Sequence, residues 1–123
     1  MSLQRHPHEV LEFWFGTRPY TPEAVAQRMR RWFGDATAPE LQPQNDEQIR
    51  LRFADLARRA ANGELAAWES SPRRRLALIL LLDQLPRNLH RGRAAAYAQD
   101  RQALELALGG MRLGADAALD PVE

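Results

Sequence analysis

The segment from Asp83 to Arg93 holds the densest cluster of polar side chains in this sequence. Its three arginines carry forked guanidinium groups that suit phosphates and carboxylates, and its amide side chains can orient a ligand through hydrogen bonds. We therefore predict that Arg87, Asn88 and Arg91 converge near Asp83 as an anion-accepting notch. The residues that we predict to bind a ligand are Asp83, Gln84, Arg87, Asn88, His90 and Arg91.

A purely structural role is the other interpretation of this segment. Asp83 and Arg87 are four residues apart, the spacing at which opposite charges pair on a helix. Asn88 and Arg91 would tie the segment to helix ends through backbone carbonyls. The partial negative charge at the C-terminus of the preceding helix also favours Arg87 at this place. The residues alone leave both interpretations open.

Catalysis would need more groups than this segment offers. His90 could act as a general base only with a nucleophile and an orienting partner nearby. Asp83 and Asp100 could orient it, but no serine lies in the segment, and Ser70 and Ser71 are better explained by helix capping. The sequence thus leaves open whether the protein catalyses any reaction.

No metal or cofactor is expected. His6 and His8 lie near the N-terminus without a carboxylate pair, so we expect both to be solvated. The sequence has no cysteine, which excludes disulfide scaffolds, zinc fingers, iron–sulfur clusters and thiol catalysis. It also lacks a glycine-rich phosphate loop. Trp14, Trp32 and Trp68 are expected to be core aromatics and not a base-stacking platform.

The 123 residues make a single domain, 1–123, with 45% hydrophobic and 27% charged residues. The longest apolar run covers residues 76–82, far short of the roughly 20 residues of a transmembrane helix. No apolar segment typical of a secretion signal is found near the N-terminus. We therefore expect a cytoplasmic protein that has no membrane partner.

Charge argues against nucleic acid as a partner. All 17 basic residues are arginine, and the formal net charge is only +1. With 20 alanines, this composition is typical of a GC-rich genome. A nucleic-acid binder would be strongly basic on one face. The arginines at 73–75 are expected to form a solvated helix end, because three charges make a small phosphate footprint.

Helices are the elements that must position these side chains. Leucine and alanine dominate, while valine occurs three times and isoleucine twice, which favours helix over strand. Apolar spacing, start signals and glycine stops predict helices over residues 7–15, 22–33, 46–61, 64–68, 72–84 and 93–113. Asn45 or Asp46 is expected to cap the third, and Asp100 to break the last. Residues 34–44 are predicted to form a loop.

The helix that precedes the polar segment is apolar on all sides. Residues 76–82 contain six large aliphatic side chains that point in every direction, so residues 74–84 should form the most buried helix. Near the end of the chain, Gly109 and Gly110 interrupt an apolar stripe. They predict either the close approach of a neighbouring helix or fraying.

Two stretches resemble a bacterial family of uncharacterised proteins, domain-of-unknown-function family 924. Residues 9–16 are similar to its VLEFWFG opening, and residues 63–92 to its signature GEL..W..SP...LALILLLDQFPRN..RG. Tyr97, Ala98 and Asp100 match the A(F/Y)A.D that follows, and Leu85 replaces a usual phenylalanine. The resemblance implies an all-α fold of antiparallel helix pairs, similar to tetratricopeptide-repeat arrays. It also implies further helices after residue 123, so this sequence would be a fragment or a short form.

The preferred function is a helical interaction module that binds a protein or peptide partner in a groove. The alternatives are a small-anion binder or enzyme that uses residues 83–93, and a structural oligomer. The stripe of Leu104, Ala107, Leu108 and Met111 would lack its usual cover, which predicts a homodimer with close approach at the two glycines. Otherwise the N-terminal aromatic helix would cover this stripe.

Overall fold

The computed structural model describes residues 6–16, 20–33, 37–114, 117, 119 and 123. Within that part of the chain every regular element is a helix and no strand occurs, so the predicted all-α class is confirmed. In chain order the elements are α1 (His6–Phe15), α2 (Pro22–Phe33), α3 (Leu41–Ala61), the 3₁₀ helix η2 (Ala66–Ser70), α4 (Pro72–Leu82), α5 (Gln84–Leu89), the 3₁₀ helix η3 (Ala94–Tyr97) and α6 (Asp100–Arg112).

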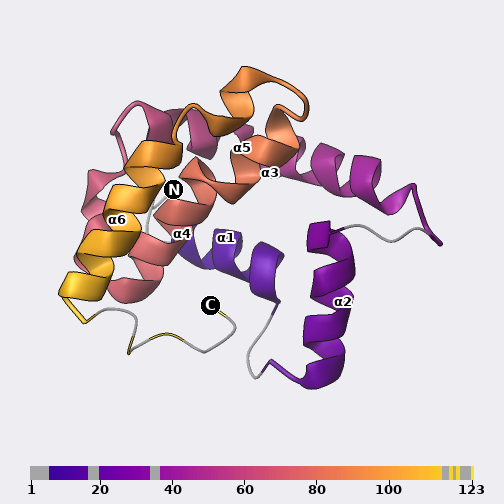
Figure 1. Ribbon diagram of the computed structural model, residues 1–123, viewed down its shortest axis with the longest axis horizontal. Helices are drawn as coiled ribbons and strands as arrows, with labels where there is room; N and C mark the ends of the chain where they lie inside the picture. The colour runs from indigo at the N-terminus through magenta and orange to yellow at the C-terminus, as the bar shows by residue number, and fades with distance from the viewer. Residues whose placement is uncertain (1–5, 17–19, 34–36, 115–116, 118, 120–122) are drawn as a thin grey trace.

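Helix α4 forms the centre of the fold. It contacts α1, α3, α5, α6 and η2, and Figure 1 shows it between α6 and α1. The Ser71 hydroxyl caps its start by accepting a hydrogen bond from the Arg74 amide at 3.3 Å, and Pro72 occupies the first turn. All side chains of residues 76–82 are buried except that of Ile79, which is half-buried. The predicted start and the predicted burial of this helix are both confirmed.

Aromatic side chains hold the first three helices together. The Phe13 ring of α1 meets Phe53 of α3 edge-on, with 5.2 Å between ring centroids. Trp14 stacks on Trp32 of α2 at 5.7 Å, and the Trp32 indole N–H donates a hydrogen bond to the Trp14 carbonyl at 3.0 Å. Trp68 of η2 is also buried. These contacts confirm that the aromatics belong to the core.

Helix α3 begins earlier than its sequence predicts. It starts at Leu41, five residues before the expected Asp46, so residues 41–44 are helical and not part of a loop. Pro43 lies in the first turn, where its missing N–H leaves no helical hydrogen bond unmade. Neither Asn45 nor Asp46 is the cap, because both lie inside the helix. Asn45 is instead buried, with 6% of its surface exposed.

The polar segment contains a helix that the sequence does not predict. Helix α4 ends at Leu82, and α5 begins two residues later at Gln84. The predicted helix ends at residue 84 because Pro86 disfavours helical geometry at Leu85; this expectation is wrong, since Leu85 is helical in α5. Pro86 falls in the first turn of α5, where no amide is required, and both side chains are buried. Burial of this pair outweighs the local preference of a residue before proline.

The last predicted helix is broken, as expected, into η3 and α6. Asp100 begins α6 but makes no capping hydrogen bond. The glycines mark a close approach to α4: a Cβ on Gly109 would lie 3.4 Å from the Arg75 guanidinium, and Gly110 is buried. The same guanidinium donates to the Leu106 carbonyl at 3.0 Å. The neighbour that these glycines approach in the structure is thus α4 of the same chain.

Candidate functional site

Arg87 of α5 lies at the centre of one polar network. Its guanidinium donates to the carboxylate and the carbonyl of Asp83, and to the Asp100 carboxylate at 3.1 Å. It also lies over the Tyr97 ring, 4.9 Å from the centroid. Gln84 joins the network by donating to Asp83 at 2.9 Å. The network therefore fastens the start of α6 and the end of η3 to the junction of α4 and α5.

Asn88 and Arg91 belong to a second network, built on Asp46 of α3. The Asn88 amide donates to Asp46 at 2.8 Å, and the Arg91 guanidinium donates to both carboxylate oxygens at 2.9 and 3.0 Å. The Asp46 side chain is 21% exposed and that of Arg91 47%. These contacts of Asn88 and Arg91 with Asp46, which we call the Asp46 fork, tie α5 and the turn after it to the first turns of α3.

The two networks raise the pKa of both arginines. Burial opposes the charge of Arg87, but the hydrogen bond and charge of Asp83, with the charge of Asp100, outweigh it and raise the pKa. The hydrogen bond to Asp46 raises the pKa of Arg91, against a smaller effect of burial. Both guanidinium groups are thus cations whose charge is already matched by carboxylates of the same chain.

The predicted ligand residues are therefore divided. Asp83, Gln84 and Arg87 come together as the spacing predicts, whereas Asn88 and Arg91 bind Asp46. The contacts of these five follow the structural interpretation, except that a carboxylate replaces the expected backbone carbonyls. His90 joins neither network; it is exposed and lines a separate cleft.

The Asp46 fork provides a first testable prediction. Asp46→Ala should lower the free energy of unfolding by about 1–2 kcal/mol, because charged hydrogen bonds are lost but solvent screens part of their value. Urea denaturation followed by circular dichroism measures this loss. Asp55 is the matched control: it also pairs with two arginines on α3, but its side chain is 63% exposed. Asp55→Ala should leave the stability nearly unchanged; equal losses would contradict a specific role for the fork.

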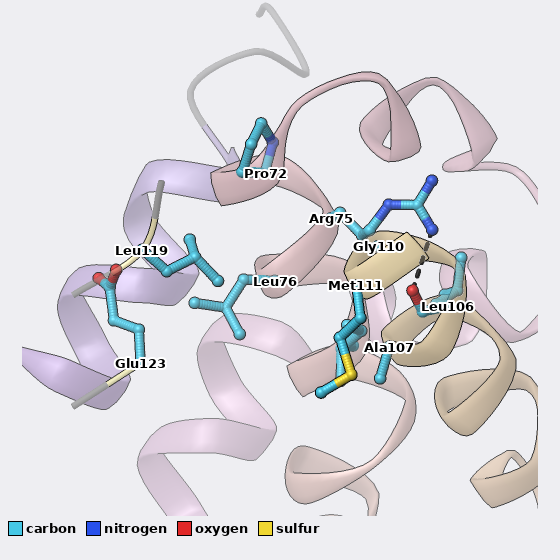
Figure 2. Close-up of a pocket in the computed structure, with 10 residues that line it drawn as sticks. Pro72, Arg75, Leu76, Leu106, Ala107, Gly110, Met111, Leu119 and Glu123 are labelled. Atoms are coloured by element: carbon cyan, nitrogen blue, oxygen red, sulfur yellow. Dashed lines mark hydrogen bonds between the residues drawn. The ribbon is translucent and has the colours of Figure 1, made fainter. Parts of the chain in front are cut away.

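A groove of about 260 Å³ lies between α4 and α6. Figure 2 shows Leu76 of α4 on one side and Ala107 and Met111 of α6 on the other, with Leu119 and Glu123 at one end. Ile79 completes the apolar lining.

The outer face of α6 continues this apolar surface into solvent. Leu104, Leu108 and Met111 are 58%, 42% and 60% exposed. The buried side chains of α6 are instead Ala103 and Leu106, whereas no side chain of the predicted stripe is buried and only Ala107 is half-buried. Helix α1 packs on α4 and does not cover the three exposed side chains.

A second, larger cleft of about 560 Å³ lies where α3, α5 and η3 meet. Its lining includes His90 and Arg93, which end the predicted polar segment, and Arg50 and Arg58 of α3. Its apolar lining residues are Ala54, Ala57, Ala61, Leu81, Pro86, Leu89, Ala95 and Ala98. Sequence reasoning missed the two α3 arginines. Arginines eight residues apart on one helix face are common on an ordinary solvated surface.

Two further features of the described residues bear on function. No helix among them is long and apolar enough to cross a membrane. Nor do three or more of their histidine, aspartate or glutamate side chains gather closely enough to hold a metal ion.

Comparison with known proteins gives two matches. A family model described as a bacterial protein of unknown function (DUF924) matches residues 10–123. The solved structure of a protein of unknown function from Agrobacterium tumefaciens matches with a TM-score of 0.76 and 32% sequence identity. That match covers 98% of this chain and 59% of the Agrobacterium chain, so the chain spans less than two thirds of that protein's length. No curated protein matches the sequence.

Proposed function

The chain belongs to the bacterial family of unknown function DUF924, and we propose that it works as a helical protein-interaction module. The observation that carries this proposal is the apolar face of α6, formed by Leu104, Leu108 and Met111 and continued by the groove beside it. Monomeric proteins rarely expose a contiguous apolar patch larger than a few hundred Å². A helix laid into an apolar groove is a common form of protein recognition. The tetratricopeptide-like pairing of helices implied by the family resemblance is part of this proposal.

The occupant that we propose is α6 of a second copy. Its three exposed apolar side chains follow the i, i+4, i+7 spacing of a single helix face, so two such faces can meet about a twofold axis. In this symmetric, antiparallel arrangement each flank of the helix meets the same flank of the other copy.

Charge on α6 favours that arrangement. Glu105 and Arg112 are seven residues apart, and they lie on the same flank of the apolar face. In the antiparallel pair Glu105 faces Arg112 of the second copy, and the twofold axis repeats this pair. Within the described chain Arg112 has no ion pair. Glu105 contacts only Arg101, at 3.5 Å between two largely exposed side chains, which solvent weakens.

A charge-reversal cycle tests this pairing. Glu105→Arg and Arg112→Glu should each weaken self-association about 3- to 10-fold, because each replaces two attractions per dimer by two repulsions. The double variant should restore the dissociation constant to within about twofold of the original. Sedimentation equilibrium gives the four constants, and circular dichroism shows that each variant is folded.

Single variants that associate as tightly as the original protein would contradict the antiparallel α6 pairing. A double variant no tighter than the single ones would contradict it as well, since the two charges would then act independently.

A further inference from the structure

The cleft between α3, α5 and η3 combines positive charge with an apolar lining. Its volume of about 560 Å³ is within the range of small-molecule sites. Three arginines and one histidine line it, and none of its described lining residues is acidic. Alanines, leucines and a proline supply the rest of its lining, apart from Gln99.

Arg93 is the principal unused cation of this cleft. Its side chain is exposed, and no hydrogen bond or ion pair joins it to any residue that the structure describes. His90 lies three residues before it in the same turn, and its imidazole likewise has no partner in the described structure. These two residues end the polar segment that the sequence singles out, whereas Arg87 and Arg91 are held by carboxylates.

The two arginines on α3 can strengthen the binding of an anion at Arg93. Arg50 binds Glu47 and Arg58 binds Asp55, in each case three residues apart on the helix surface. All four side chains are more than half exposed, and exposed ion pairs of this kind are weak. Each guanidinium also retains N–H donors that its carboxylate does not use. An anion in the cleft can therefore share these donors without breaking either pair.

We propose that this cleft binds a small organic anion, whose phosphate or carboxylate meets Arg93 and whose apolar body rests on the alanine- and leucine-rich lining. Guanidinium groups bind both kinds of anion through paired N–H donors. The apolar lining adds affinity for a body of the size of a benzene ring. This site is separate from the α6 face, so its binding of an anion can be tested independently of self-association.

Phenyl phosphate is a suitable probe, with inorganic phosphate, benzoate and benzyl alcohol as companions. Titrations of the full chain, followed by NMR, should show saturable shifts for Arg93 and His90 with phenyl phosphate. Inorganic phosphate should bind more weakly because it lacks the apolar body, and benzyl alcohol should bind more weakly because it lacks the charge. Comparison with benzoate shows which anionic head the cleft prefers.

Arg93→Gln should weaken phenyl phosphate binding about 10-fold, because a charged hydrogen-bond donor is replaced by a neutral one. Arg101→Gln is the matched control, since that arginine is 92% exposed on α6 and should leave binding unchanged. Leu108→Arg should also leave it unchanged, which separates this site from the proposed interaction surface. Absence of saturable binding in the original protein, or equal losses for Arg93→Gln and Arg101→Gln, would overturn the proposal.

Discussion

Leu80→Ala should lower the free energy of unfolding by about 2–5 kcal/mol. Leu80 lies in the last turn of α4 and is 4% exposed, and α4 is enclosed by five neighbouring elements. Removing three buried carbons loses their transfer free energy and leaves a cavity that rigid neighbours fill only in part. The loss would be a large share of the total stability of a domain, which is typically about 5–15 kcal/mol.

Urea denaturation followed by tryptophan fluorescence and circular dichroism measures this effect. Leu51→Ala is the matched control, because Leu51 lies on α3 with 65% of its surface exposed. Its cost should stay below about 0.5 kcal/mol. A loss of that small size for Leu80→Ala would show that α4 is not enclosed as described.

Leu108→Arg should weaken self-association about 100-fold or more. In the proposed antiparallel pair Leu108 is buried between two copies, and the substitution would act twice in each dimer. Leu108 is 42% exposed, so its burial by a partner contributes about 0.6–1.3 kcal/mol per copy and about 1.3–2.5 kcal/mol per dimer, which approaches the roughly 2.8 kcal/mol of a 100-fold change. The arginine also brings an unpaired charge into an apolar contact, which adds to the loss.

Leu51→Arg tests whether the effect is specific. It places the same charge on another exposed leucine, outside the α6 face. Sedimentation velocity should give the same dissociation constant for this variant as for the original protein. Equal weakening by both substitutions would indicate that charge alone, and not burial of Leu108, controls association.

The parts of the fold that sequence predicts well are those with local signals. Helix α2 has the predicted bounds, 22–33, because proline begins it and the apolar spacing runs without interruption to Phe33. Helix α4 follows from Ser71 and Pro72 at its start and from an apolar run too continuous for a surface helix. In both helices the start signal and the apolar spacing agree, and in α4 the burial agrees with them.

The errors occur at prolines, because a proline can either interrupt a helix or lie in the first turn of one. Pro43 and Pro86 both indicate loops when taken as helix breakers, yet both lie in the first turn of a helix. Whether a proline breaks a helix or begins one depends on where the neighbouring side chains are buried. The burial of Leu85 decides this at α5, and that burial is a tertiary property.

The same limit applies to the polar networks. The pair of Asp83 and Arg87 follows from a spacing of four residues on a helix. The contacts of Arg91 and Asn88 with Asp46 span more than forty residues, and no local signal predicts them. The cleft with Arg93 is equally non-local, because α3 supplies two of its three arginines and the turn after α5 supplies the third, Arg93.

The stripe on α6 could be predicted from the sequence, including its lack of cover within the chain. Leu104, Leu108 and Met111 share a face with the helical period, and all three are exposed. The core accepts the smaller Ala103 and Gly110 and one leucine, Leu106, because α6 lies close to α4. Leu104, Leu108 and Met111 are left outside, available to a partner.

The mass of the original protein across a dilution series tests the proposed α6 pairing most directly. The interface between two α6 helices is small, so we expect a dissociation constant on the order of 10–100 μM. Light scattering should therefore give a mass approaching that of a dimer at several hundred micromolar and that of a monomer below about 1 μM. A monomer mass that persists throughout, including at about 500 μM, would contradict the proposal that α6 docks a second copy.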